Sequence, residues 1–191
     1  MSMRIIVIHG SYGSPEGNWF PWLKRELESI GHQVLLPRFP TPEDQSLPIW
    51  KAVLAGEVKK IDSSCILIGH SIGAGFVLNI LEDLAGEPVR ASCLIAGFLG
   101  DLGLPDFDAI NSSFVNRDFD WTRIRANAGD VLVMSGDNDP YVPLDRGMEL
   151  AGRLSVPLDI VPGGGHLNAE SGFTSFPLLV DKLRPFLGGD Q

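Results

Sequence analysis

The feature that most constrains this chain is a regular alternation of short apolar runs with helical patterns. The runs are continuously apolar and rich in Val, Ile and Leu, as expected for strands that are covered on both faces of a sheet. The expected strands are residues 4–9, 33–37, 65–70, 91–96, 131–135 and 158–161. The expected helices are residues 19–30, 47–61, 72–84, 144–154 and 176–187. This order predicts an α/β fold in three layers, with a mainly parallel sheet of about six strands and helices on both faces. The length of 191 residues suits a single domain over residues 1–191.

Charge and hydropathy exclude several classes of partner. The net charge of −9 repels phosphate backbones, and no basic stripe offsets it, so we expect no nucleic acid partner. No apolar run approaches the roughly 20 residues that span a bilayer, so we expect no membrane partner. The N-terminus enters a strand pattern at once, so we expect no signal peptide. Cys65 and Cys93 lie in apolar strand patterns and are interpreted as buried thiols, which favours a cytoplasmic location.

The segment CILIGHSIGAGF contains the pattern G-x-S-x-G between a predicted strand and a predicted helix. A nucleophile elbow requires this context, because the tight turn leaves no room for side chains at Gly69 and Gly73 and exposes Ser71. The N-terminus of the following helix favours developing negative charge. The pentapeptide alone is a weak signal, but its position makes Ser71 the candidate nucleophile.

Two further predicted strands end in segments that could complete such a site. VLVMSGDNDPYVPL carries Asp137 and Asp139, either of which could orient an imidazole, although both residues are also common in turns. LDIVPGGGHLNAESGF carries His166 on a glycine-rich loop, where a histidine can shuttle a proton, although a lone histidine is more often structural. The chain order serine, aspartate, histidine is that of α/β-hydrolases.

The loop HGSYGSPEGNW after the first predicted strand has the backbone freedom that an oxyanion hole needs. Acyl transfer requires two backbone N–H donors. One is expected from Ile72, directly after the candidate nucleophile, and the other from Ser11 or Tyr12. The alternative is a simple turn. His9 is interpreted as a residue that fixes this loop, not as a second base.

The chain resembles the small serine hydrolases of the retinoblastoma-binding protein 9 and YdeN group. The resemblance covers nearly the whole chain and is carried by IVIHGSYGSPEGNWFPWLKRELESIGHQVLLPRFPTPE, GHSIGAG, GDNDPYVP and GGGHLNAESGF. It implies a compact α/β-hydrolase fold without the superfamily's first strands and with a minimal lid or none. It also implies a triad of Ser71, Asp139 and His166, since Asp139 matches the family's acid position better than Asp137.

Other residues leave alternatives open. His70, Trp19, Phe98 and Leu99 are candidates for a substrate pocket, although the favoured interpretation of Trp19 and its neighbour Trp22 is that they pack in the core or against the helix. Residues 97–121 lack clean periodicity and form either an apolar flap over the site or an ordinary connection. Asn168 and Glu170 are expected to brace the histidine loop. The four histidines show no metal-binding spacing, and no phosphate-binding glycine motif is present, so we expect neither a metal nor another cofactor.

These observations predict a serine hydrolase that cleaves small carboxylic esters or related acyl compounds through an acyl-enzyme intermediate. A small acyl compound is the expected partner, and a protein partner remains compatible with the sequence. Two other hypotheses stay open. The fold could serve as a protein-binding module with little catalytic activity, or the same triad could act as a peptidase or amidase.

Overall fold

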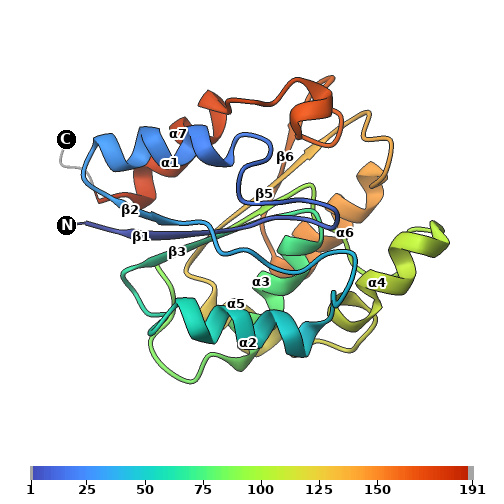
Figure 1. The fold of residues 1–191 in the computed structure, drawn as a ribbon, viewed down its shortest axis with the longest axis horizontal. Coiled ribbons are helices and arrows are strands. Elements are labelled where there is room, and N and C mark those ends of the chain that lie inside the picture. The colour runs from blue at the N-terminus through green and yellow to red at the C-terminus, as the bar shows by residue number, and fades with distance from the viewer. Residues whose placement is uncertain (1, 189–191) are drawn as a thin grey trace.

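A computed structural model of the chain describes residues 2–188. Its centre is one parallel sheet of six strands in the order β2-β1-β3-β4-β5-β6 (Figure 1). The strands are β1 (Arg4–Ile8), β2 (Gln33–Leu35), β3 (Cys65–His70), β4 (Ala91–Ile95), β5 (Asp130–Gly136) and β6 (Leu158–Val161). All six expected strands are present, and their bounds differ from the expected ones by at most two residues. Chain order reverses at β1, the neighbour of both β2 and β3, which is where ligands bind in open α/β sheets.

Seven α-helices occur within residues 2–188. They are α1 (Phe20–Ser29), α2 (Leu47–Glu57), α3 (Ile72–Asp83), α4 (Pro105–Val115), α5 (Trp121–Asn127), α6 (Leu144–Leu154) and α7 (Pro177–Leu183). Four expected helices are shorter than predicted, α1 and α3 by one residue at one or both ends and α2 and α7 by four or five residues in all. The backbone becomes extended at Val58, which ends α2. Leu183 ends α7, and a 3₁₀ turn over Arg184–Phe186 follows, because Pro185 lacks the N–H that a continuing helix would use.

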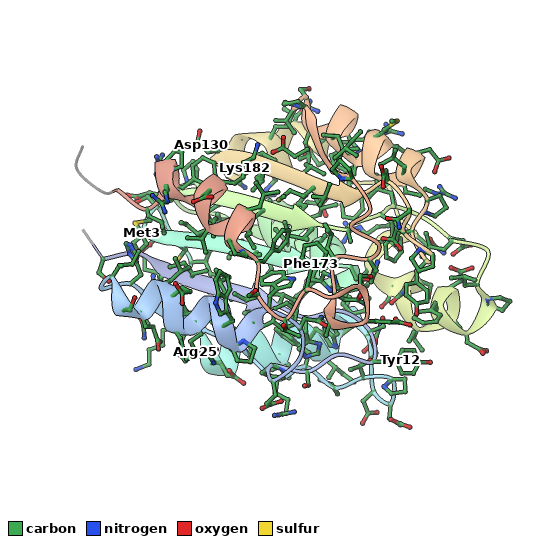
Figure 2. All side chains as sticks on the ribbon, turned by 90° about the horizontal axis from the view of Figure 1, so that it is seen from above. Met3, Tyr12, Arg25, Asp130, Phe173 and Lys182 are labelled. Atoms are coloured by element: carbon green, nitrogen blue, oxygen red, sulfur yellow. The ribbon has the colours of Figure 1, made fainter. Side chains whose placement is uncertain are left out.

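Helices cover both faces of the sheet, as predicted. The helices α1 and α7 pack on one face, where Leu23 and Leu183 meet Ile5 and Ile68 in a single buried cluster. The other face carries α2, α3, α5 and α6, and its core includes Trp50 from α2 (Figure 1). With all side chains drawn, Arg25 lies on the exposed side of α1 (Figure 2), whereas Lys182 of α7 forms an ion pair with Asp159 of β6 at 2.8 Å. Both cysteines are buried and free.

Residues 97–121 contain helical structure that the sequence pattern did not predict. The helix α4 begins at Pro105, a residue suited to the first turn, and the Asp108 carboxylate accepts hydrogen bonds from the N–H groups of Leu102 and Leu104. Only three residues of α4 are fully buried, so it has no continuous apolar stripe. Within residues 2–188, no helix is long and apolar enough to cross a membrane, and no group of three or more potential metal ligands occurs.

Candidate active site

Ser71 occupies the sharp turn between β3 and α3. Its backbone has φ 57° and ψ −125°, a conformation that L-residues rarely adopt and that is typical of a nucleophile elbow. The two flanking glycines are required by packing. A Cβ atom at Gly69 would lie 2.4 Å from the Gly73 carbonyl oxygen, and one at Gly73 would lie 2.4 Å from the Ile8 carbonyl oxygen. The turn therefore packs directly on the end of β1.

The histidine and aspartate loops meet beside this turn. His166 Nδ1 lies 2.7 Å from Asp139 Oδ2. Burial raises the pKa of Asp139, but the hydrogen bonds from His166 and from the Val142 and Tyr141 N–H groups outweigh it and bring the pKa below its usual range. The carboxylate is therefore ionised at neutral pH, so Nδ1 carries the proton and donates it.

The neighbouring aspartate has a different contact. Asp137 Oδ1 accepts a hydrogen bond of 2.7 Å from the Gly163 N–H, and Asn138 Oδ1 accepts one of 2.7 Å from the Gly165 N–H. These two side chains tie the loop after β5 to the loop after β6. Of the two candidate acids, Asp139 is thus the one that contacts the imidazole. Asp137 instead helps to hold the backbone of the loop that carries His166.

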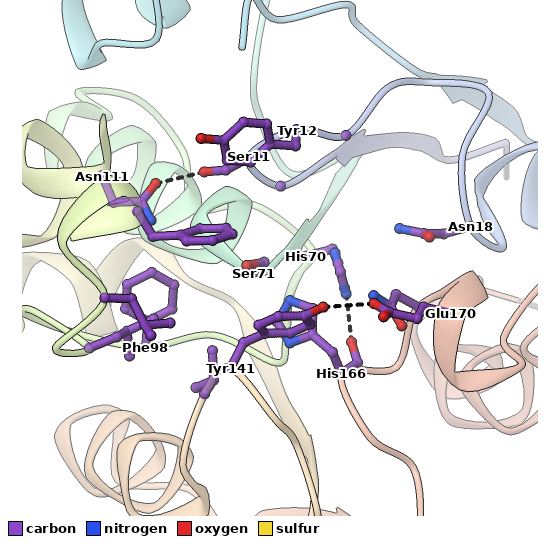
Figure 3. A pocket seen from close by; sticks show the side chains of 17 residues that line it. Ser11, Tyr12, Asn18, His70, Ser71, Phe98, Asn111, Tyr141, His166 and Glu170 are labelled. Atoms are coloured by element: carbon purple, nitrogen blue, oxygen red, sulfur yellow. Dashed lines mark hydrogen bonds between the residues drawn. The ribbon is translucent and has the colours of Figure 1, made fainter. Parts of the chain in front are cut away.

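Ser71 and His166 line the same cavity of about 330 Å³ (Figure 3). Within residues 2–188, no hydrogen bond joins Ser71 Oγ to the imidazole. Such bonds are often long in unliganded hydrolases and shorten when substrate binds. The sheet topology thus brings together three side chains that lie far apart in the sequence.

Two other histidines support the site through the backbone. His70 Nε2 donates to the His166 carbonyl oxygen at 2.9 Å. Burial and the nearby His166 lower the pKa of His70 to about 3, so its ring is neutral. His9 Nε2 accepts from the Phe39 N–H at 3.1 Å, which leaves Nδ1 to donate to the Gly10 carbonyl at 2.9 Å. Burial lowers the pKa of His9 as well, and its contacts agree with the predicted loop-fixing role.

The backbone donors around Ser71 Oγ differ in availability. Ile72 is the first residue of α3, so its N–H has no acceptor within the helix. The Tyr12 N–H donates to Thr41 Oγ1 at 2.7 Å. No acceptor within residues 2–188 takes the Ser11 N–H. Of the two expected donors from the first loop, Ser11 is therefore the one whose N–H is free.

The pocket is lined by both polar and apolar groups. Its lining residues are Gly10, Ser11, Tyr12, Gly13, Asn18, His70, Ser71, Phe98, Leu102, Leu104, Phe107, Asn111, Tyr141, Val142, His166, Asn168 and Glu170. His70 and Phe98 were among the expected pocket residues. The segment 98–111, which includes much of α4, forms an apolar wall, so residues 97–121 are not merely a connection remote from the site.

Two expected pocket residues do not line this cavity. Trp19 is fully buried behind it, where its indole N–H donates to the Leu167 carbonyl oxygen at 2.9 Å and its ring packs on Phe176. The core position favoured from the sequence is therefore correct for Trp19. Leu99 instead lines a separate surface groove, which residues of α6 also line.

Sequence reasoning missed an aromatic arc across the mouth of the pocket. Phe107 of α4 has its ring centroid 5.3 Å from that of Tyr12 and 6.2 Å from that of Tyr141. The Tyr141 ring lies 5.2 Å from that of His166, and its hydroxyl donates to Glu170 Oε2 at 2.8 Å (Figure 3). The hydrogen bond to Glu170 raises the pKa of the Tyr141 hydroxyl.

Asn168 supports the histidine loop, as expected. Its Oδ1 accepts a hydrogen bond from the Ser171 N–H at 3.0 Å.

Comparison with known proteins decides the family. A family model described as serine hydrolase matches residues 5–185. The chain belongs to this serine hydrolase family. Two relatives align over almost their full length. YdeN of Bacillus subtilis (strain 168) is 29% identical over 187 residues, which are 97% of each chain. Serine hydrolase RBBP9 of Rattus norvegicus is 28% identical over 187 residues, 96% of this chain and 97% of the relative.

Solved structures place this member of the serine hydrolase family in the α/β-hydrolase fold. The crystal structure of the Bacillus subtilis ydeN gene product has a TM-score of 0.91 at 28% identity and covers 98% of this chain and 100% of its own. A meta-cleavage product hydrolase from Pseudomonas fluorescens IP01 has a TM-score of 0.66 at 16% identity, with 97% and 89% covered. The latter likeness concerns the fold alone.

Proposed function

We propose that this serine hydrolase cleaves small carboxylic esters or related acyl compounds through a triad of Ser71, His166 and Asp139. The observation that carries the proposal is the 2.7 Å contact between His166 Nδ1 and the ionised Asp139 carboxylate, beside a serine on a nucleophile elbow. The contact keeps the proton on Nδ1, which leaves Nε2 as the nitrogen that can accept the serine proton.

In the acylation step, Ser71 Oγ forms a bond to the carbonyl carbon while His166 Nε2 takes its proton. The carbonyl oxygen becomes an oxyanion, which the N–H groups of Ile72 and Ser11 stabilise. Collapse of this intermediate breaks the bond to the leaving alcohol, and the alcohol receives the proton from His166. Removal of one such oxyanion donor typically lowers kcat by a factor of about 100 to 1000.

In the deacylation step, His166 takes a proton from water as the water oxygen attacks the acyl carbon. The ester bond to Ser71 then breaks, and the proton returns to Ser71 Oγ. The products are the free carboxylic acid and the regenerated enzyme. No cofactor enters either step. The apolar wall of the pocket, from Phe98 to Phe107, supports an uncharged acyl group as its occupant.

An active-site fluorophosphonate probe tests the proposal. Wild-type protein should be labelled covalently and should hydrolyse p-nitrophenyl acyl esters, and the Ser71→Ala variant should do neither. Folded wild-type protein that resists the probe would favour the protein-binding alternative. Turnover of aminoacyl amides well above that of the matched esters would show instead that the triad serves a peptidase or amidase.

A further inference from the structure

A buried glutamine outside the pocket is hydrogen-bonded to the candidate oxyanion loop. Gln45 precedes α2 and is 8% exposed. Its Nε2 donates to Ser11 Oγ at 2.9 Å and to Asn111 Oδ1 at 2.8 Å. Its Oε1 accepts from the Thr41 hydroxyl at 2.6 Å. Both ends of the amide are therefore engaged, which is the condition for a rigid buried polar network.

Two of the contacts of Gln45, those with Ser11 and Thr41, lead to two consecutive residues of the loop. On one side, Thr41 Oγ1 accepts a hydrogen bond from the Tyr12 N–H at 2.7 Å, and the same hydroxyl donates a hydrogen bond to Gln45 Oε1. On the other side, Gln45 holds the Ser11 hydroxyl directly. The network thus forms hydrogen bonds with the Tyr12 N–H and the Ser11 hydroxyl but none with the Ser11 N–H.

The network also connects the loop to the wall of the pocket. The Ser11 hydroxyl donates to Asn111 Oδ1 at 2.7 Å, and Asn111 is 2% exposed on α4 (Figure 3). Gln45 Nε2 lies 3.2 Å from the Ile110 carbonyl oxygen on the same helix. Because Gln45 joins the loop to α4, its contacts restrict the directions in which the Ser11 backbone can move.

We propose that Gln45 is a positioning residue that aims the Ser11 N–H at the oxyanion. The inference rests on the proposed function, and it extends that function to a residue that does not line the pocket. An oxyanion hole acts through donors that are fixed before charge develops. Without the contacts of Gln45 with Ser11 and Thr41, the Ser11 N–H would sample several directions. The transition state would then lose more stabilisation than the bound substrate would.

The test compares Gln45→Met with wild type on a p-nitrophenyl ester. Methionine has a similar length and an apolar end that makes none of the amide contacts. We expect kcat to fall about tenfold or more while KM changes less than about twofold, the pattern of an interaction made in the transition state. Backbone hydrogen exchange in residues 10–13 should become faster in the variant.

A second buried amide gives a matched control. Asn127 Nδ2 donates to the Leu81 and Leu84 carbonyl oxygens and does not line the pocket. Asn127→Leu should lower thermal stability while kcat and exchange in residues 10–13 stay at wild-type values. If Gln45→Met fails to fold, Gln45→Glu replaces it. The glutamate keeps the acceptor for Thr41 but offers no donor to Ser11, so the same fall in kcat is expected.

Folded Gln45 variants with wild-type kcat, or with a change in KM alone, would overturn the inference. If wild-type protein itself hydrolyses no ester, the proposed function fails, and hydrogen exchange still decides whether Gln45 holds the loop. Unchanged exchange in residues 10–13 would then overturn the positioning role as well.

Discussion

Asp139 holds His166 with one carboxylate oxygen and is itself held through the other. Oδ2 lies 2.7 Å from His166 Nδ1, and Oδ1 accepts the N–H groups of Tyr141 and Val142 at 2.9 and 3.0 Å. The backbone of the loop after β5 therefore holds the carboxylate in position independently of its contact with the imidazole. Asp137, two residues earlier, makes no contact with the imidazole, because its Oδ1 accepts the Gly163 N–H instead.

The first prediction concerns Asp139→Asn. The amide can present its NH₂ group to Nδ1, which favours the wrong tautomer of His166 and leaves no basic nitrogen toward Ser71. We expect kcat for ester hydrolysis to fall on the order of 10,000-fold with the fold retained. The matched control is Asp137→Asn, which keeps an oxygen acceptor for the Gly163 N–H and should retain wild-type kcat. Equal losses in the two variants would contradict the assignment of Asp139.

The second prediction concerns the close approach of the first loop to the nucleophile. A Cβ atom at Gly10 would lie 2.9 Å from Ser71 Cβ and 3.3 Å from the His70 carbonyl oxygen, neither of which can easily move. Gly10→Ala should displace the loop and lower kcat on the order of 100-fold. In Gly17→Ala, on the same loop, the nearest atom is a carbonyl oxygen at 3.4 Å, so its kinetics should match wild type. Wild-type kcat in folded Gly10→Ala would rule out this packing argument.

Most of the sheet could be predicted because parallel strands buried on both faces leave continuous apolar runs. The run at residues 65–70 became β3 with the predicted bounds. The helix α4 could not be predicted in this way, because it packs through only a few residues, such as Phe114 and Val115, and leaves the rest half-exposed or exposed. A helix supported on one narrow side has no strong period in its sequence.

Site residues could be predicted where they directly follow a strand. They could not be predicted where their role depends on contacts with residues far away in the sequence. The positions of Ser71, Asp139 and His166 follow from β3, β5 and β6. No sequence pattern indicates that Gln45 contacts Ser11, because this contact depends on how two loops fold over each other. The indole of Trp19 meets a carbonyl 148 residues away, so the sequence could not decide between core and pocket.

The third prediction concerns Phe107 as a determinant of acyl size. Its ring bridges Tyr12 and Tyr141 across the pocket mouth, so removing it should open space on the apolar side. In Phe107→Ala, the ratio of kcat/KM for an octanoyl ester to that for an acetyl ester should rise roughly tenfold. The control is Phe173→Ala, which removes a ring packed 4.9 Å from Phe176 and away from the pocket. An unchanged ratio in Phe107→Ala would mean that α4 does not limit acyl length.

The last prediction links His70 to stability in mild acid. Burial, with a smaller effect of the nearby His166, lowers the pKa of His70 to about 3 in the folded chain, against about 6.5 in the unfolded chain. The unfolded chain therefore binds more protons between these values, so the stabilising contribution is complete above pH of about 6.5 and is lost progressively below it. His70→Gln should remove this dependence. Between about pH 7.5 and 5.0, the free energy of unfolding should fall by on the order of 2 kcal/mol more in wild type than in the variant. Urea unfolding at the two pH values measures the difference.

Other titratable groups do not produce this difference between the two proteins. His9 titrates in the same direction but is present in both proteins, and Asp139 loses its stabilising contribution only below about pH 4. An equal fall in both proteins would show that the folded state protonates His70 as readily as the unfolded chain does.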